Sequence, residues 1–324
     1  MKAYTSNNIR NIAVLGHGGK GKTTLCEAML YIAGASDRLG RVADGNTVLD
    51  FDSEEKRRKS SVSSAIAALE WDNTKLNIID APGLFDFEGG AAEAVRAAEA
   101  VLIVTSAGSG VDVGTEKAFR AAEKKGAAKF FAITKTDSDH RNFYKTFDAL
   151  KEVYGNKLCP TIIPYMEGNI TKCYVNLMTG MAFSYDENGK ATKVPVPEDS
   201  VIEEMTSAFM EAVATTDDAL MEKFFEGEKF TKEEILKGLC IGIFDGSIYP
   251  VYAVSGLTCA GVDQLLYGLA WSAPGAFGYA GEKCTYENGE EGILPCDENG
   301  PLAAVCFKTI ADPFAVSYTH LTLP

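Results

Sequence analysis

The sequence predicts an α/β fold with a doubly wound, mostly parallel sheet, and three observations lead to this class. Short apolar runs, each suited to a buried strand, alternate with segments whose apolar residues recur at helical spacing. A glycine-rich turn at residues 16–24 joins the first strand to the first helix. The composition, 46% hydrophobic and 23% charged, is that of a globular protein. Strands connected through helices lie parallel, and the helices cover both faces of their sheet.

The glycine-rich turn has the spacing of a phosphate-binding loop (P-loop), G-x-x-x-x-G-K-[ST]. Glycines let the backbone approach a phosphate, and the N–H groups at a helix N-terminus attract anions. Lys22 would reach the β- and γ-phosphates, and the Thr23 hydroxyl would bind Mg²⁺. We therefore expect nucleotide contacts from the whole loop, which comprises Gly16, His17, Gly18, Gly19, Lys20, Gly21, Lys22, Thr23 and Thr24.

The polar segment after the first helix contains a charged run at residues 53–60. Nucleotide switches place a mobile loop at this point of the chain, so we expect a switch loop here. Strands are predicted at 65–71 and 75–80. The second ends in Asp80, and P-loop enzymes use such a carboxylate to hold Mg²⁺. The nearby Gly83 can offer its backbone N–H to a γ-phosphate.

The first domain is expected to span residues 1–274 and to continue the same alternation. We predict helices at 90–100, 115–125 and 261–270, and strands at 101–106, 129–134 and 249–255. The interval between Asp137 and the last strand is far longer than one crossover helix, which predicts an inserted α+β subdomain at about 157–245. Helix 142–153 would precede it. Its expected elements are strands at 161–165, 173–178, 181–185 and 191–194 and acidic helices at 200–214, 217–225 and 231–239, the last with a capping box at Thr231 and Glu234.

The C-terminal residues have a different character. Residues 275–300 are rich in glycine, proline and charge, which predicts a linker with a loose hairpin. Residues 301–315 would begin a new β domain. Residues 316–324 share no pattern with what precedes them, and one back-translation of them resembles a sequencing adapter read in frame. We expect these to be a non-native tail, in which His320 has no function; the alternative is a genuine β continuation.

Charge and cysteine content narrow the class of protein. The net charge of −14 argues against a broad basic surface, so we expect no direct DNA binding, although a local patch could dock on a ribonucleoprotein. The eight cysteines show no metal-type spacing, and without a signal peptide they are typical of reduced cytosolic thiols. No apolar run approaches the ~20 residues that span a bilayer. We expect a monomeric cytoplasmic protein with no membrane contact.

Four elements in order indicate a guanine nucleotide: the P-loop, Asp80 to Gly83, the Thr134–Asp137 motif TKTD, and Ser255-Gly256-Leu257. The Asp137 carboxylate can accept hydrogen bonds from guanine N1–H and the exocyclic amine, which adenine does not present. Lys135 can lay its alkyl stem over the base, and the Gly256 N–H can reach the guanine carbonyl. The predicted ligands are GTP or GDP with Mg²⁺. The alternative is a P-loop kinase or ATPase that uses ATP.

These motifs resemble the translational GTPases of the elongation factor G family, in particular its elongation-factor-G-like paralogues. The similar segments are GHGGKGKTTL, DAPGLFDFEG, GVDVGTEKAFR, EAVATTDDALMEKFFEG, SGLTCAGVDQLL and AAVCFKTIADPF. The resemblance implies a P-loop GTPase domain with the family's inserted subdomain, followed by the first strand of a truncated β-barrel domain. It also implies the ribosome as a partner, and the ribosomal stalk protein as a partner of the acidic helices.

The sequence departs from that family at positions that matter for turnover. Leu84 stands where the family has the histidine that positions the attacking water, and loss of such a group costs roughly 10²–10⁴-fold in rate. Thr134 replaces an asparagine, a loss of about 1 kcal/mol or near fivefold in affinity. Ser61 keeps the hydroxyl of the Mg²⁺-binding switch threonine. Gly19 replaces an aspartate linked to a monovalent cation, and we hypothesise that Lys20 partly replaces the cation.

The sequence therefore predicts a ribosome-associated GTPase, acting in translocation or ribosome recycling, with hydrolysis weakened at Leu84. Lys22 and Leu84 are the catalytic positions, and Thr23, Ser61 and Asp80 are the expected Mg²⁺ ligands. The alternative is a GTP-dependent regulatory switch that binds the nucleotide with negligible hydrolysis.

Overall fold

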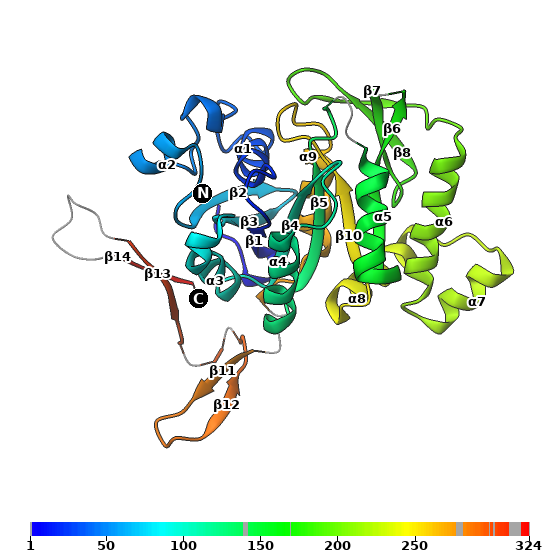
Figure 1. Cartoon of the computed structure of the whole chain (residues 1–324). Coiled ribbons are helices and arrows are strands. Elements are labelled where there is room, and N and C mark those ends of the chain that lie inside the picture. The colour runs from blue at the N-terminus through cyan, green and yellow to red at the C-terminus, as the bar shows by residue number, and fades with distance from the viewer. Residues whose placement is uncertain are drawn as a thin grey trace.

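A computed structural model describes residues 2–138, 142–168, 170–276, 281–297, 299–300 and 302–310, and the backbone of 319–323. Its centre is a ten-stranded sheet (Figure 1). The strands, in spatial order, are β2 (Ala65–Trp71), β3 (Thr74–Asp80), β1 (Ile9–Leu15), β4 (Ala100–Ser106), β5 (Ala128–Thr134), β10 (Tyr249–Ala253), β6 (Leu158–Glu167), β7 (Ile170–Asn176), β8 (Met181–Tyr185) and β9 (Ala191–Val194).

The six strands from β3 to β6 pair in parallel, while β2 and β7–β9 pair antiparallel at the two sides. This confirms the predicted mostly parallel α/β sheet. Every residue of β4 and β5 is buried, as expected for central strands with helices on both faces. Helices α1 (Lys22–Ile32) and α9 (Val262–Ser272) pack together on one face. Helices α3 (Glu88–Arg96), α4 (Val113–Lys125) and α5 (Phe143–Tyr154) cover the other.

The inserted segment extends the main sheet. Strand β6 pairs in parallel with β10, and β7, β8 and β9 continue from it as an antiparallel meander. Helices α6 (Ser200–Ala214), α7 (Asp218–Glu226) and α8 (Lys232–Asp245) follow, with α6 packed on β6 and α8 in contact with α9. The capping box of Thr231 and Glu234 is confirmed at the start of α8. That helix runs beyond residue 239 and ends at Asp245, and Gly246 caps it in the left-handed conformation at φ 76°.

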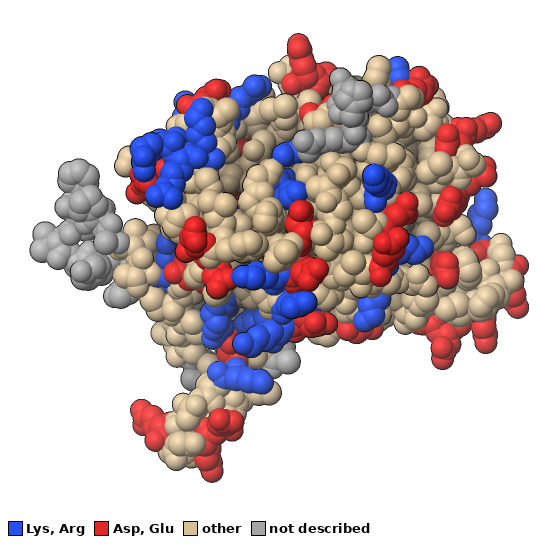
Figure 2. All heavy atoms as spheres, in the orientation of Figure 1, with Lys and Arg blue, Asp and Glu red and all other residues tan. Residues whose placement is uncertain are grey.

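The charged run in the expected switch loop forms a short helix, α2 (Ser53–Arg58), so the prediction of a loop there was wrong. A capping box explains the helix, because Asp52 accepts from the first turn while Glu55 bonds back to the Asp52 N–H. Glu54 also pairs with Arg57 and Arg58 on the outer side. The helix presents a cluster of basic side chains to solvent (Figure 2).

Two antiparallel hairpins follow the main domain and extend away from it in Figure 1. Strand β11 (Glu282–Thr285) pairs with β12 (Glu291–Leu294) within the predicted linker, and β13 (Val305–Ile310) pairs with β14 (Thr319–Leu323). The predicted tail lies partly outside the described residues. Across the described ranges, no helix is long and apolar enough to cross a membrane.

Candidate functional site

The P-loop lies between β1 and α1, where two glycines make its path possible. Gly16 has φ 142°, and a Cβ there would lie 2.2 Å from the Val104 carbonyl oxygen. Gly21 caps α1 in the left-handed conformation at φ 87°. The Lys22 amino group donates to the carbonyls of Gly16 and His17, each at 3.0 Å. Burial lowers the pKa of Lys22, and the negative charge of Asp80 opposes this shift. The loop therefore holds a buried cation inside its curve.

The three predicted metal ligands meet at one point beside the P-loop. The Thr23 hydroxyl donates to Asp80 Oδ2 at 2.6 Å and lies 3.1 Å from Ser61 Oγ. Ser61 donates in turn to Asp50 Oδ1 at 2.7 Å. Burial raises the pKa of Asp80 to about 7 and also raises that of Asp50. Asp50 was not predicted, because a lone aspartate in a polar segment gives no signal of its own.

This cluster has the chemistry of a magnesium site. Asp80 Oδ1 and Asp50 Oδ2 are buried and have no hydrogen-bond partner among the residues that the structure describes, so each carries unused acceptor capacity. Mg²⁺ prefers hard oxygen ligands and is bound through one or two carboxylates together with substrate phosphates. Within the described ranges no group of three or more His, Cys, Asp or Glu residues could hold a metal ion. The cluster beside Thr23 instead combines two carboxylates with two hydroxyls. The residues fit the ion.

Glu27, one turn along α1 from Thr23, fixes the segment that carries Asp50. Its side chain is fully buried, and Oε1 accepts the backbone N–H groups of Val48 and Leu49 at 2.7 and 2.9 Å. A Cβ at Gly40 would lie 2.1 Å from Glu27 Oε2, so the loop also closes tightly over the carboxylate. Burial raises the pKa of Glu27. An acidic residue on the buried side of an amphipathic helix was the signal that could have identified it.

Gly83 approaches the P-loop so closely that a side chain does not fit. A Cβ there would lie 2.1 Å from Lys22 Nζ and 2.8 Å from the Gly18 nitrogen. The next residue, Leu84, is 42% exposed at the mouth of this region. Its Cδ2 lies within 3.1 Å of the position of a Cβ on Gly18. Leucine thus places a hydrocarbon group, with no donor or acceptor, next to the P-loop.

The TKTD loop and the P-loop are joined by two hydrogen bonds. The Thr134 hydroxyl lies 2.6 Å from the Lys20 carbonyl and 3.0 Å from that of Thr105, and its one proton serves the closer acceptor best. Lys135 has φ 60° and donates to the Gly19 carbonyl at 2.7 Å. The Asp137 side chain is exposed. The hydroxyl that replaces the amide thus still links the two loops.

The Ser255–Leu257 segment follows β10 and lies beside the start of α1. Ser255 is buried, and its Oγ accepts the Thr258 N–H at 3.1 Å. A Cβ at Gly256 would lie 3.0 Å from the Leu25 nitrogen, so glycine is needed for this close packing. Because β5 and β10 are parallel neighbours, this segment and TKTD leave the same edge of the sheet. The expected base-reading groups are therefore adjacent.

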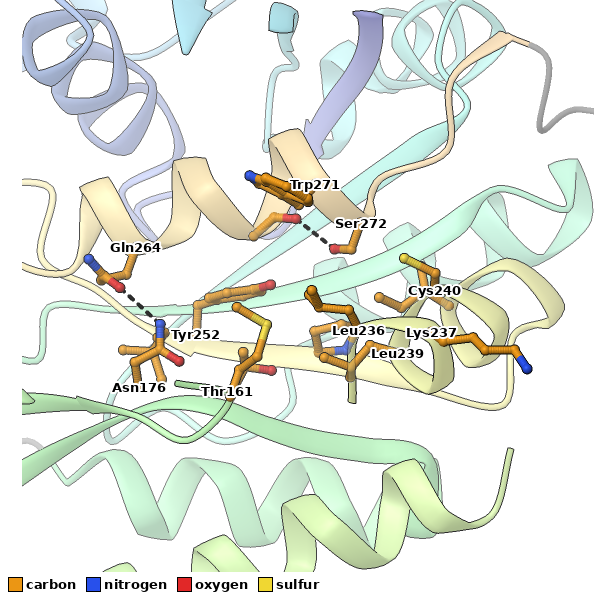
Figure 3. Close-up of a pocket in the computed structure, with 15 residues that line it drawn as sticks. Thr161, Asn176, Leu236, Lys237, Leu239, Cys240, Tyr252, Gln264, Trp271 and Ser272 are labelled. Carbon is orange, nitrogen blue, oxygen red and sulfur yellow. Dashed lines mark hydrogen bonds between the residues drawn. The ribbon is translucent and has the colours of Figure 1, made fainter. Parts of the chain in front are cut away.

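Lys20 points to α4, where its amino group lies 2.9 Å from Asp112 Oδ2. Its expected role in replacing a cation remains a prediction. A hollow of about 330 Å³ lies on this side of the P-loop, lined by Gly19, Lys20, Ser106, Ala107, Gly108, Ser109 and Lys135. An apolar cavity of about 230 Å³ lies elsewhere, between α8, α9 and the inserted strands (Figure 3), and contains none of the predicted site residues.

Comparison with known proteins identifies relatives of this chain. The family model of the elongation factor Tu GTP binding domain matches residues 7–274. An elongation factor G-like protein from two strains of Mycobacterium tuberculosis is 32% identical over 310 residues, which cover 94% of this chain and 43% of that protein. A crystal structure of a protein from Thermus thermophilus has a TM-score of 0.83 and 33% identity, over 95% of this chain and 44% of that one.

The chain thus spans less than half the length of these relatives. The resemblance expected from the motifs is confirmed. The chain belongs to the translational GTPase family that carries the elongation factor Tu GTP-binding domain, and it is a relative of the elongation-factor-G-like proteins.

Proposed function

We propose that this protein binds GTP with Mg²⁺ and hydrolyses it slowly in connection with the ribosome, in translocation or ribosome recycling. The observation that carries the proposal is the convergence of Thr23, Ser61 and Asp80 beside the P-loop lysine. The two loops expected to read the base leave the same edge of the sheet. Phosphate, metal and base contacts are thereby supplied from one continuous surface.

The roles of the residues follow from their positions. Lys22 and the N–H groups at the start of α1 would hold the phosphates, as a helix N-terminus favours anions. Thr23, Asp80 and Ser61 would hold Mg²⁺, which neutralises phosphate charge when bound. Asp137 and the Gly256 N–H would bind guanine. Competition binding with GTP and ATP tests this base assignment, since only guanine offers two donors to Asp137.

Weak hydrolysis is proposed because Leu84 cannot orient water. The decisive experiment compares Leu84→His with the parent in single-turnover GTP hydrolysis with ribosomes. We expect the histidine variant to be faster by roughly 10²-fold or more, with an unchanged Kd for GTP. Leu84→Ala is the matched control, because it removes the hydrocarbon group without adding a donor. If histidine gives no gain over alanine, this account of catalysis is wrong.

Leu84 also favours the second candidate, a regulatory switch that acts by GTP occupancy with negligible hydrolysis. The site holds the nucleotide through residues other than Leu84, so binding does not depend on turnover. Ribosome-stimulated hydrolysis by the full-length protein, at a rate that supports repeated cycles, would remove this candidate.

Charge distribution supports the proposed partners. Basic side chains of α2, Lys56, Arg57 and Arg58, form a local cluster beside the nucleotide site, although the whole chain carries −14 (Figure 2). Such a cluster suits the phosphates of ribosomal RNA. Acidic side chains gather over the inserted helices α6 and α7 (Figure 2), which we propose meet the stalk protein. We place the protein in the cytoplasm as a monomer, with no membrane partner and no direct DNA binding.

A further inference from the structure

The inserted strand β7 touches the TKTD loop with two side chains. Thr171 donates its hydroxyl proton to the Thr136 carbonyl at 2.9 Å, and the Tyr174 hydroxyl lies 2.7 Å from Thr136 Oγ1. Thr136 is only 4% exposed, whereas its neighbour Asp137 is exposed. Thr136 is therefore an inward side chain of the loop, and it rests on the insertion.

The acceptors around Thr136 fix the direction of these hydrogen bonds. Thr136 Oγ1 lies 3.0 Å from the Val254 carbonyl, which can only accept, so the threonine donates its one proton there. It then accepts from Tyr174. Burial raises the pKa of Tyr174, which keeps the phenol protonated and able to donate. Since Val254 directly precedes Ser255, one chain of hydroxyls joins β7 to both loops expected to read the base.

Tyr174 is itself held firmly. It is 4% exposed, and its ring meets that of Tyr185 edge to face with centroids 5.5 Å apart. The Tyr185 hydroxyl donates to Asp263 at the start of α9, at 2.6 Å. Further along β7, Asn176 donates to Gln264 of α9 at 2.9 Å, as Figure 3 shows. One link to α9 from β7 itself, and a second from the neighbouring strand β8, thus hold the part of the sheet from which Tyr174 projects.

We infer that Tyr174 is a positioning residue for guanine recognition, whose hydroxyl, through Thr136, holds the TKTD loop where Asp137 meets the base. The inference deepens the proposed function and rests on its assignment of Asp137 as the guanine reader. It gives the insertion a part in nucleotide selectivity that is separate from any contact with a partner.

The experiment measures the Kd of GDP and of IDP, whose hypoxanthine base lacks the exocyclic amine, for the parent chain and for Tyr174→Phe. Guanine makes one more hydrogen bond to Asp137 than hypoxanthine does, so it loses more when the loop shifts. We expect GDP affinity to fall roughly fivefold, the effect of one lost hydrogen bond, and IDP affinity to fall less. Thr136→Val should likewise reduce the ratio of GDP affinity to IDP affinity. Thr136→Ser keeps the hydroxyl and should retain the ratio of the parent chain.

Tyr144→Phe is the matched control. Tyr144 lies on α5, and its phenol donates to the Pro164 carbonyl at 2.6 Å. Its removal should leave the affinities for GDP and IDP unchanged. A purely structural role for Tyr174 would lower the GDP and IDP affinities by the same factor. That result, or no change in either affinity, would overturn the inference about Tyr174 and leave the proposed role of Asp137 intact. A parent that binds GDP and IDP equally would overturn the role of Asp137 and the inference with it.

Discussion

Removal of the Glu27 carboxylate is the sharpest test of how the metal side of the site is built. Glu27→Ala deletes the acceptor of two backbone N–H groups. Leu49 is 2% exposed, so its N–H stays unsatisfied at a cost of about 1–3 kcal/mol. Val48 is 48% exposed and its N–H can bond to water, which limits that loss to about 1 kcal/mol. We expect the free energy of unfolding to fall by about 3 kcal/mol.

The same substitution should affect the nucleotide site. Leu49 precedes Asp50, whose carboxylate accepts the Ser61 hydroxyl at 2.7 Å. Release of this segment frees the Asp50–Ser61 pair, so GDP binding by Glu27→Ala should need a higher Mg²⁺ concentration than binding by the parent. Urea unfolding without nucleotide measures the first effect, and GDP titrations at stepped Mg²⁺ concentrations measure the second.

Glu54→Ala is the control, because Glu54 makes exposed ion pairs with Arg57 and Arg58 in the same region and should change stability far less than Glu27→Ala does. Glu27→Gln keeps an acceptor oxygen and should recover most of the loss in stability.

Burial raises the pKa of Glu27 above 4.5, so the folded state binds the proton of this carboxyl group more tightly than the unfolded chain does. The parent should therefore lose stability relative to Glu27→Gln as pH rises above about 4.5. A Glu27→Ala variant no less stable than Glu54→Ala would refute the reasoning.

Two other substitutions test the P-loop. Gly83→Ala places a Cβ 2.1 Å from Lys22 Nζ. It should weaken GTP binding, measured by calorimetry, by roughly tenfold or more, the value of a charge-assisted hydrogen bond. Gly89→Ala is the control, because a Cβ there meets nothing within 4 Å and should leave GTP binding unchanged. Equal GTP affinities for the two variants would contradict this. Lys20→Ala should change how single turnover responds to potassium, and an unaltered potassium response would count against Lys20 as a replacement for a cation.

The sequence predicted the parts of the site that depend on local chain geometry. The P-loop needs only a strand, glycines and a helix start in order, so Gly16 to Thr24 could be identified without any tertiary information. Asp80 followed from its place at the end of an apolar strand, and Ser61 from alignment with a family motif. The structure brings both residues to Thr23. For Asp80 the reason is that β3 pairs with β1 in a register that sets it opposite Val14.

Residues whose role depends on long-range packing could not be predicted. Tyr174 became relevant only because β6 adds to β10, and that pairing joins segments far apart in the chain. Asp50 meets the site through a loop whose path no local pattern indicates. Glu27 carries a helical signal of burial, but its link to the site runs through the same loop. The helix α2 is different, since Asp52 and Glu55 form a capping box that is present in the sequence. The high charge of residues 53–60 favoured the prediction of a loop instead of this helix.

The position of Leu84 makes its substitution a clean test of catalysis. Its side chain is 42% exposed, so a histidine can be accommodated there without repacking the core. The metal ligands and the base-reading loops lie on other segments and should keep their geometry in the variant. Because the α1 and TKTD contacts are independent of residue 84, a change in single-turnover rate at constant GTP affinity would report on the water-positioning step itself. Unchanged rate at unchanged affinity would instead place the limit on turnover elsewhere in the site.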